Sequence, residues 1–434
     1  MHVPQATGAG NDDYLVPRSQ AWFAFAMTFG LMLFDYIDRQ VIVSLFPYMK
    51  ADWSLSDKQL GGLVSVISIV VALLGLPVAL LADRVSRVKS IVVMATVWSL
   101  ATISCMFTRS YGALFAARAL VGAGEAGYGS VGAALIASLF PRRLRGALLG
   151  AFFAAASLGS VIGVVLGGVI AARWGWQMAF GVVGVPGLFL ALLYLFVRDY
   201  KTVDIQGATQ SGTQLSLGLL VRRTFRTLAG TRTLVWACAG AAMQLIVVSA
   251  IWSWLPSFFN RYHGVPAEHA GQKAALVVLA GAVGSFAWGS MVDRMALGRT
   301  RVRLLIVSAL CLLSMVIFLV AFGLMSASPL QFGLILVGGF VMACTVGPIS
   351  AVVLDVIHPA MRSTGAAVLS LAQNLLGLAV GPFLTGLLSD LWSLQTALTV
   401  VPLFSLLAVA AFLRATGSYE ADMHAVAGIR VSAE

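Results

Sequence analysis

Three ionisable side chains lie inside an apolar stretch near the start of the chain. Asp35, Asp38 and Arg39 fall within the run from Ala21 to about Phe46, which is long enough to cross a bilayer. A charge at that depth costs roughly 3 kcal/mol or more unless it is paired or faces water. The spacing places all three on one helical face. Two interpretations fit this pattern: an ion or substrate site at mid-membrane, or a buried ion pair that locks helices together.

Arg118 and Glu125 form a second charged face in a later apolar stretch. They are seven residues apart, so two helical turns place them on the same side of a helix. They reach a depth similar to that of the first three groups, which gives two positive and three negative charges. One carboxylate is left without a partner, and such a group in a low-dielectric site is a candidate proton acceptor. We predict Glu125 in this role, with Asp35 as second choice, and we expect Asp38 to neutralise Arg39.

The composition indicates an all-α membrane protein with many spans. Of 434 residues, 59% are hydrophobic and 10% are charged, against about 25% charged residues in soluble proteins. The first apolar stretch has charges in its core and no cleavage site, so we expect a retained helix rather than a signal peptide. Twelve transmembrane helices are predicted, near 21–46, 59–82, 88–107, 111–139, 147–172, 178–197, 234–258, 272–292, 302–323, 329–356, 365–389 and 394–413.

The net charge of +11 follows the loops and does not indicate a nucleic-acid partner. Most Lys and Arg residues fall in the loops on one side of the predicted membrane, which predicts cytoplasmic termini in a multi-pass protein of a bacterial inner membrane. The cysteines lie within predicted spans and show no CxxC spacing, so neither disulfides nor a metal site is expected. These are Cys105, Cys238, Cys311 and Cys344.

The two halves of the chain repeat one another. Asp83-Arg84 after the second span is matched by Asp293-Arg294 after the eighth, and two glycine sets share one spacing. The glycine sets are Gly159, Gly163 and Gly168, and Gly377, Gly381 and Gly386. We predict two pseudo-symmetric six-helix bundles. The predicted segments are a tail at 1–20, bundles at 21–197 and 234–413, a cytoplasmic linker at 198–233, in which 215–228 is either a surface helix or plain linker, and a tail at 414–434.

The repeated motifs suggest how such bundles could move. The charges at the cytoplasmic helix ends predict a gate that holds this side closed in an outward-facing state, and ordinary interfacial charge is the alternative. The predicted gate residues are Asp83, Arg84, Arg87, Arg145, Asp293, Arg294, Asp355 and Arg362. The glycine rows permit close helix approach, which indicates either a sliding contact between the bundles or tight packing alone.

The second half has almost no charge inside its spans and offers aromatic and amide side chains instead. A cavity that is ionic on one wall and aromatic, amide and apolar on the other suits an amphipathic organic substrate with one charged end better than a sugar. The candidate cavity residues are Tyr36, Tyr128, Gln244, Trp252, Gln373 and Asn374.

These features resemble the major facilitator superfamily, whose loop signature reads roughly Gly-x-x-x-Asp-Arg-x-Gly-Arg-Lys. The first copy here has Ala79 and Ser86 in the glycine places, whereas the second copy keeps Gly289. The first half is similar to the Spinster-like branch, although Gln177 replaces the arginine usual after Gly-Trp. The matching stretches include Asp35-Tyr36-Ile37-Asp38-Arg39, the run Ala117 to Tyr128, Phe140-Pro141, and Gly184-Val185-Pro186-Gly187.

The resemblance implies a secondary carrier that works by alternating access. It implies proton coupling and gating by Asp38, Arg39, Arg118 and Glu125, with the proton gradient as energy source and no cofactor. Substrates of the branch include lysophospholipids and sphingoid phosphates, but bacterial relatives are diverse, so the substrate itself does not carry over. We expect a small amphipathic or organic-anion substrate, contact with membrane lipid, and function as a monomer.

Other functions are compatible with parts of this pattern. Within transport, the alternatives are a symporter for small organic or aromatic carboxylates, with Arg39 or Arg118 holding the anion, and a multidrug efflux carrier. An enzyme is not expected, because no HExxH, GxSxG or GxxxxGK[ST] motif lies where it could serve chemistry. A membrane sensor that transports nothing is a weaker alternative, since no large soluble segment is present.

Overall fold

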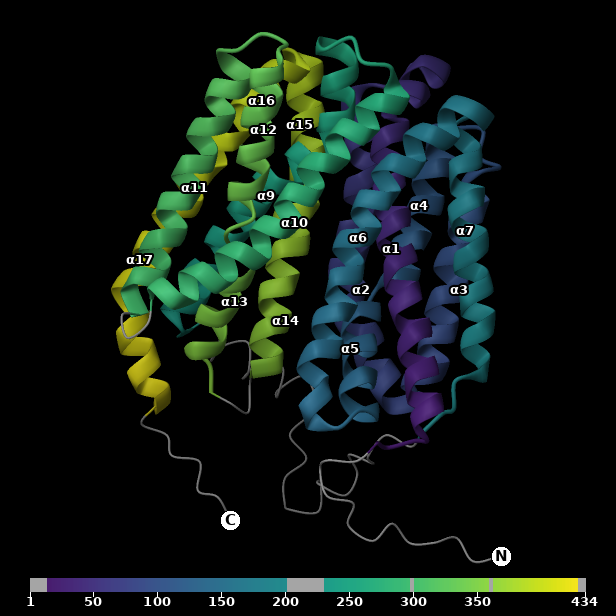
Figure 1. Ribbon diagram of the computed structural model, residues 1–434, viewed down its shortest axis with the longest axis vertical. Coiled ribbons are helices and arrows are strands. Elements are labelled where there is room, and N and C mark those ends of the chain that lie inside the picture. Colours follow the sequence, from purple (N-terminus) through teal and green to yellow (C-terminus); the bar gives the residue numbers. More distant parts are fainter. Residues whose placement is uncertain (1–13, 201–229, 297–299, 359–361, 428–434) are drawn as a thin grey trace, which may run out of the picture.

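The computed structural model describes residues 14–200, 230–296, 300–358 and 362–427. This part of the chain is almost entirely helical and contains no strand. Twelve of its spans are long and apolar enough to cross a membrane, which confirms the predicted all-α fold. The described chain begins and ends at the same end of the molecule, which we call the inner face, and the opposite end is the outer face (Figure 1).

The spans form two bundles that stand side by side in Figure 1. The first bundle holds α1 (Arg18–Trp53), α2 (Asp57–Val85), α3 (Arg87–Cys105), α4 (Tyr111–Glu125) with α5 (Tyr128–Leu139), α6 (Arg142–Trp174) and α7 (Trp176–Leu193). The second holds α9 (Arg232–Tyr262), α10 (Ala267–Met295), α11 (Thr300–Gly323), α12 (Pro329–Met342) with α13 (Val346–Asp355), α14 (Arg362–Ala372) with α15 (Val380–Leu391), and α16 (Leu394–Val400) with α17 (Phe404–Ala427).

Serine caps fix where several helices begin. Ser56 and Gln59 form a capping box at the start of α2, and the side chains of Ser86, Ser110 and Ser328 accept a backbone N–H at the starts of α3, α4 and α12. Each cap satisfies N–H groups that have no partner within the helix, so the chain can leave one span and enter the next through a short connection.

The fourth and tenth spans are both broken, in matching places of the two bundles. The fourth breaks after Glu125, where Gly127 takes a φ of 84° that suits glycine. The tenth breaks between Met342 and Val346. The eleventh span contains a π-helical turn at Gln373–Leu378. Interrupted helices in equivalent positions of two repeats are typical of the substrate region of transporters.

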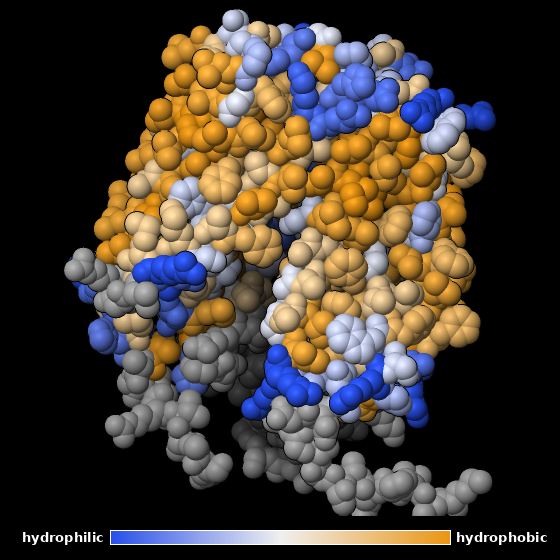
Figure 2. Space-filling model, viewed as in Figure 1, coloured by the Kyte–Doolittle hydropathy of each residue, from blue (hydrophilic) through white to orange (hydrophobic). Residues whose placement is uncertain are grey.

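The two bundles are closed against each other on the outer side and separated on the inner side. Phe46 of α1 meets Trp254 of α9 with ring centroids 5.1 Å apart, and α6 packs on α10 near the outer face. Toward the inner face the surface is hollowed between the bundles, below a broad apolar belt (Figure 2). The structure is therefore open toward the inner face, a state that we call inward-open.

The glycine rows serve mainly to pack helices within one bundle. A Cβ at Gly159 or Gly163 would meet the backbone of α1, and one at Gly381 would meet that of α9. The last member of each set lies instead at the other bundle: Gly168 faces Glu268 at the start of α10, and Gly386 faces the backbone at the start of α2. Close packing within bundles thus accounts for most of these glycines, and the outermost pair joins the two bundles.

Three of the expected segment boundaries differ from the structure, the first because α1 begins at Arg18, inside the tail expected at 1–20. The tail expected from residue 414 is wrong over most of its length, because α17 continues as a helix to Ala427. The second bundle begins slightly earlier than expected, at Arg232. The possible surface helix at 215–228 lies outside the described residues.

Candidate functional site

The structure brings the five ionisable groups of the first bundle together, and it pairs Asp38 with Arg118. Nη1 of Arg118 donates to Oδ1 of Asp38 at 3.1 Å, and the hydroxyl of Thr102 donates to the other oxygen at 2.5 Å. Arg118 is 0% exposed and Asp38 is 2% exposed. The expected pairing of Asp38 with Arg39 is wrong, because adjacent residues of a helix point in directions about 100° apart.

Arg39 is shared by two carboxylates. Its Nε lies 3.0 Å from Oδ1 of Asp35 and 3.0 Å from Oε2 of Glu125, which is 2% exposed. The N–H is directed to Asp35, so neither oxygen of Glu125 accepts a hydrogen bond within the described residues. Since Asp38 and Arg118 neutralise each other, Glu125 is the carboxylate with the weakest compensation, and a buried charge without hydrogen bonds is unfavourable.

Arg118 also has unused hydrogen-bonding groups. Its Nε and Nη2 have no partner within the described residues, and its guanidinium lies 5.9 Å from the centre of the Phe180 ring. A planar guanidinium with free N–H groups can bind a carboxylate or phosphate through two parallel hydrogen bonds. In the inward-open state this group is closed off from solvent.

The predicted gate residues form one charge cluster in each bundle. In the first, Nε of Arg87 pairs with Asp83 at 2.7 Å and its Nη1 donates to Ser138 at 2.9 Å. Arg145 donates to the carbonyl of Phe140 at 2.8 Å. Each of these contacts stays within the first bundle, as expected where the inner side is open.

In the second bundle, Arg303 joins two predicted gate residues. It lies 3.3 Å from Asp293 and 2.8 Å from Asp355, to which the hydroxyl of Tyr419 also donates. The sequence shows Arg303 only as one of several arginines after the Asp-Arg pair, so its part was not predicted. Of the remaining predicted gate residues, Arg84 and Arg294 are exposed, and the side chain of Arg362 lies outside the described residues.

Four of the six candidate cavity residues are half-buried: Tyr36, Trp252, Gln373 and Asn374. The Tyr36 ring lies 5.3 Å from the guanidinium of Arg39, and the indole N–H of Trp252 has no partner within the described residues. Gln373 and Asn374 begin the π-helical turn. Their assignment to one wall of a cavity stays a prediction.

Tyr128 and Gln244 do not line a cavity, and their assignment to it is wrong. Both are fully buried inside their own bundle. The Tyr128 hydroxyl donates to the carbonyl of Thr28 at 2.6 Å, and the Gln244 amide bonds to Ser405 and to the carbonyl of Met342. A buried polar side chain must find partners in the protein, and these two find them in the bundle core.

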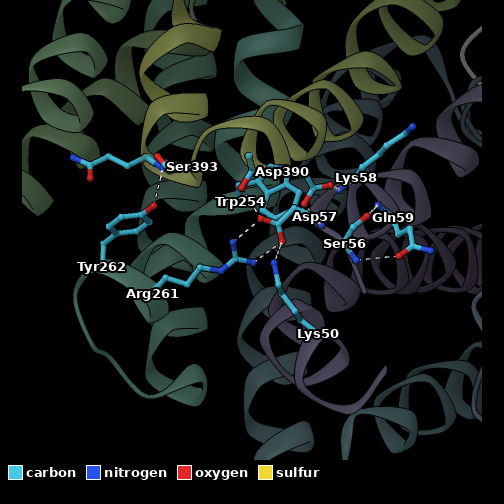
Figure 3. A network of polar contacts seen from close by, with 12 residues as sticks. Lys50, Ser56, Asp57, Lys58, Gln59, Trp254, Arg261, Tyr262, Asp390 and Ser393 are labelled. Carbon is cyan, nitrogen blue, oxygen red and sulfur yellow. Dashed lines mark hydrogen bonds and ion pairs between the residues drawn. The ribbon is translucent and has the colours of Figure 1, made fainter. Parts of the chain in front are cut away.

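Asp57 is the centre of a polar network that the sequence did not reveal (Figure 3). Its carboxylate is 2% exposed and accepts from Lys50 of α1 at 2.6 Å, from the hydroxyl of Ser389 of α15, and from both terminal nitrogens of Arg261 of α9 at 2.6 and 2.7 Å. Asp390 of α15 in turn accepts the backbone N–H groups that begin α2, at 2.8 Å each.

This network joins the two bundles at the outer face. Lys50 and Asp57 belong to the first bundle, and Arg261, Ser389 and Asp390 to the second. A bidentate arginine–carboxylate pair is among the stronger polar contacts in proteins. In the sequence, Asp57 after Ser56 resembles an ordinary acidic residue in the first turn of a helix, and Arg261 is too distant for its role to be recognised.

Comparison with known proteins agrees with this architecture. The family model of the Major Facilitator Superfamily matches residues 28–379. Protein spinster of Drosophila melanogaster is 26% identical over 389 residues, which cover 86% of this chain and 63% of that protein. The sphingosine-1-phosphate transporter of Danio rerio is 24% identical over 383 residues, covering 84% of this chain and 75% of that protein.

A solved structure shares this fold. The bacterial homologue of the human lysosomal transporter Spinster, in an inward-facing and unoccupied conformation, superposes with a TM-score of 0.82 at 20% identity, covering 94% of this chain and 99% of the other. The chain belongs to the major facilitator superfamily and is similar to its Spinster proteins.

Proposed function

We propose that this protein is a proton-coupled secondary carrier that moves an amphipathic organic solute with a charged end by alternating access. The observation that carries this proposal is the buried cluster in which Glu125 and Asp35 share one cation, Arg39. Because one cation faces two carboxylates, one of them lacks a full countercharge, and such a group is suited to exchange a proton. We propose that each opening of the carrier exposes this cluster to one side of the membrane.

The proton step follows from the pairing. When Glu125 binds a proton, Arg39 keeps Asp35 as its single charged partner, and the two charges cancel. When Glu125 releases the proton, the cluster carries one excess negative charge, which favours water or a cationic substrate group nearby. Coupling requires that this change occurs on opposite sides of the membrane in the two states.

Two sets of contacts would alternate as gates. The Asp57 network closes the outer side in the inward-open state. We propose that the clusters around Arg87 and Arg303 close the inner side in the outward-open state. In that state each cluster would give up the contacts that it now makes within its own bundle and would form contacts with the other bundle. A single chain holds both bundles and both gates, so we propose that the monomer is the working unit.

The substrate class rests on the side chains that we propose to line the hollow. The half-buried Tyr36 and Trp252 would offer aromatic surface, whereas the buried cluster would offer charge on one wall. An amphipathic molecule with one charged end, such as a lysolipid or sphingoid phosphate, would satisfy both. The sphingosine-1-phosphate transporter of Danio rerio is a relative whose name gives a substrate of this kind.

Transport by proteoliposomes under an imposed pH gradient tests the proposal. Lysolipids, sphingoid phosphates, cationic drugs and aromatic acids serve as labelled solutes. One of them should accumulate while the gradient lasts and leak back when a protonophore collapses it. Accumulation that survives collapse of the pH gradient would contradict proton coupling.

The symporter for small organic carboxylates is favoured by one observation, the partnerless Nε and Nη2 of Arg118. If these groups hold a substrate carboxylate, Arg118→Lys should weaken substrate binding by about tenfold or more, because an ammonium cannot make the bidentate contact. Competition binding to the purified protein measures this. If Arg118→Lys instead keeps the wild-type affinity for every acid that binds, the carboxylate function is excluded.

We also propose that the inner face is cytoplasmic, as the distribution of Lys and Arg residues predicts. The native cysteines are buried, so single introduced cysteines can report on sidedness. Ser326→Cys on the outer face should react with a membrane-impermeant maleimide on intact cells, and His424→Cys on the inner face only after permeabilisation. The opposite labelling pattern would invert the proposed orientation.

A further inference from the structure

A cleft of about 510 Å³ lies between α9 and α17 near the inner face, within the second bundle. Its size is in the range of small-molecule sites. It belongs to neither the charged cluster nor the hollow between the bundles. Its lining residues are Arg232, Trp236, Arg414, Gly417, Ser418, Ala421 and Asp422.

The cleft has an excess of positive charge. The carboxylate of Asp422 already accepts a hydrogen bond from the backbone N–H of Thr233 at 2.8 Å. The hydroxyls of Thr233 and Ser418 are hydrogen-bonded to each other at 2.8 Å. Arg232 and Arg414 make no ion pair within the described residues. The guanidinium of Arg414 lies 4.8 Å from the centre of the Trp236 ring, which holds it over the cleft. Two arginines of one site suit an anion with several oxygens.

The position of the cleft identifies the source of that anion. On both helices the chain changes from polar to apolar at this level: Arg232 begins α9 and exposed Val235 follows, while Arg414 follows exposed Leu413 on α17. Tryptophan and arginine at such a boundary mark the level of lipid headgroups. A ligand that places an anion between the arginines would lay an apolar part along Val235 and Leu413.

We propose that this cleft binds the phosphate group of an anionic glycerophospholipid from the surrounding leaflet. Arg232 and Arg414 hold the phosphate oxygens, Trp236 orients Arg414, and the acyl chains lie on the apolar surface of α9 and α17. The site is independent of the transport pathway, so it stands whether or not the protein is a proton-coupled carrier.

Gly417 provides a way to block the cleft without changing its charge. A Cβ at this glycine would meet no heavy atom within 4 Å, so a larger side chain fits without clash and projects into the open space. Leucine also favours a helix more than glycine does, so Gly417→Leu should not destabilise α17. Gly417→Ala is the matched control, because its methyl group leaves most of the cleft free.

Native mass spectrometry of the full-length protein in detergent tests the site, with phosphatidylglycerol as the probe. Wild type and Gly417→Ala should retain the lipid. Gly417→Leu, and the double variant Arg232→Gln with Arg414→Gln, should each lower its affinity by about tenfold or more. Arg301→Gln should have no effect, because Arg301 is paired with Glu420 outside the cleft. Equal retention by wild type and Gly417→Leu would overturn the proposal, even if the double variant fails to fold.

Two further binding experiments identify the ligand. Diacylglycerol, which has the same chains without a phosphate, should not be retained, and equal retention would show apolar adsorption instead of phosphate binding. Inorganic phosphate at the same concentration as the lipid should not displace phosphatidylglycerol. Full displacement would assign the cleft to free phosphate and overturn the lipid site.

Discussion

Glu125→Gln is expected to abolish accumulation of the substrate against its gradient while leaving exchange across the membrane intact. Glutamine mimics the protonated side chain and keeps its size, so Arg39 retains Asp35 and the cluster stays neutral. A gradient of one pH unit is worth about 1.4 kcal/mol per proton, enough for about tenfold accumulation at one proton per substrate. The variant should lose this tenfold accumulation entirely.

Proteoliposomes that carry the variant measure this in two assays, uptake under a pH gradient and counterflow without one. Glu420→Gln is the matched control, because it makes the same chemical change in an exposed ion pair with Arg301. Glu125→Gln should show no accumulation in the uptake assay and should exchange substrate in the counterflow assay as wild type does. Wild-type accumulation by Glu125→Gln would remove Glu125 as the proton carrier and leave Asp35 as the candidate.

Asp57→Asn is expected to shift the resting protein from inward-open toward outward-open. The change leaves Arg261 and Lys50 with a neutral partner in a buried network that holds the outer side closed. Because the two cations left behind are 26% and 41% exposed and can be hydrated, losing their charge-assisted hydrogen bonds costs about 2 kcal/mol, which corresponds to a change of about 30-fold in the ratio of the two states. Arg261→Gln should act in the same direction, since it breaks the same contact from the second bundle.

Distances between spin labels at the inner ends of the bundles report the shift. Labels at Arg143 of α6 and Met295 of α10, both exposed, should move closer in Asp57→Asn. Asp52→Asn is the control, because Asp52 accepts from Trp176 at 3.0 Å within the first bundle and so lies at the same face without joining the bundles. Identical distance distributions in wild type, Asp57→Asn and Arg261→Gln would show that the network does not hold the gate.

The sequence predicted the features that follow from a regular pattern of residues or from a large energetic cost. The spans follow from apolar length, and the meeting of the charged faces of α1 and α4 follows because buried charges must be compensated. The pairing inside the cluster could not be predicted in this way. Asp38 bonds to Arg118 and Arg39 reaches Glu125 because of the relative rotation of two helices, which no spacing within either helix specifies. Only the contact of Arg39 with Asp35 follows from spacing, since the two residues are four apart in one helix.

The features that the sequence missed depend on contacts between distant segments. Asp57 has the position of an ordinary helix-capping acid, and only the approach of α9 and α15 makes it a junction between bundles. Tyr128 and Gln244 have side chains that suit a cavity, but helix rotation turns them into the bundle cores. Residue type predicts what a side chain can do, whereas the packing of whole helices decides what it faces.

The glycine contacts at the outer face have a mechanical consequence. Gly168 and Gly386 occupy equivalent places in the two repeats, and each meets the first turn of a helix in the other bundle, α10 and α2 respectively. These two contacts define a rotation axis near the outer ends of the long helices. Because α2 has 29 residues and is about 43 Å long, a rotation of roughly 10° about this axis displaces its far end by about 7.5 Å. Such a rotation would open or close a path for a lipid-sized molecule. The residues at the two glycine contacts would move by less than the length of one side chain.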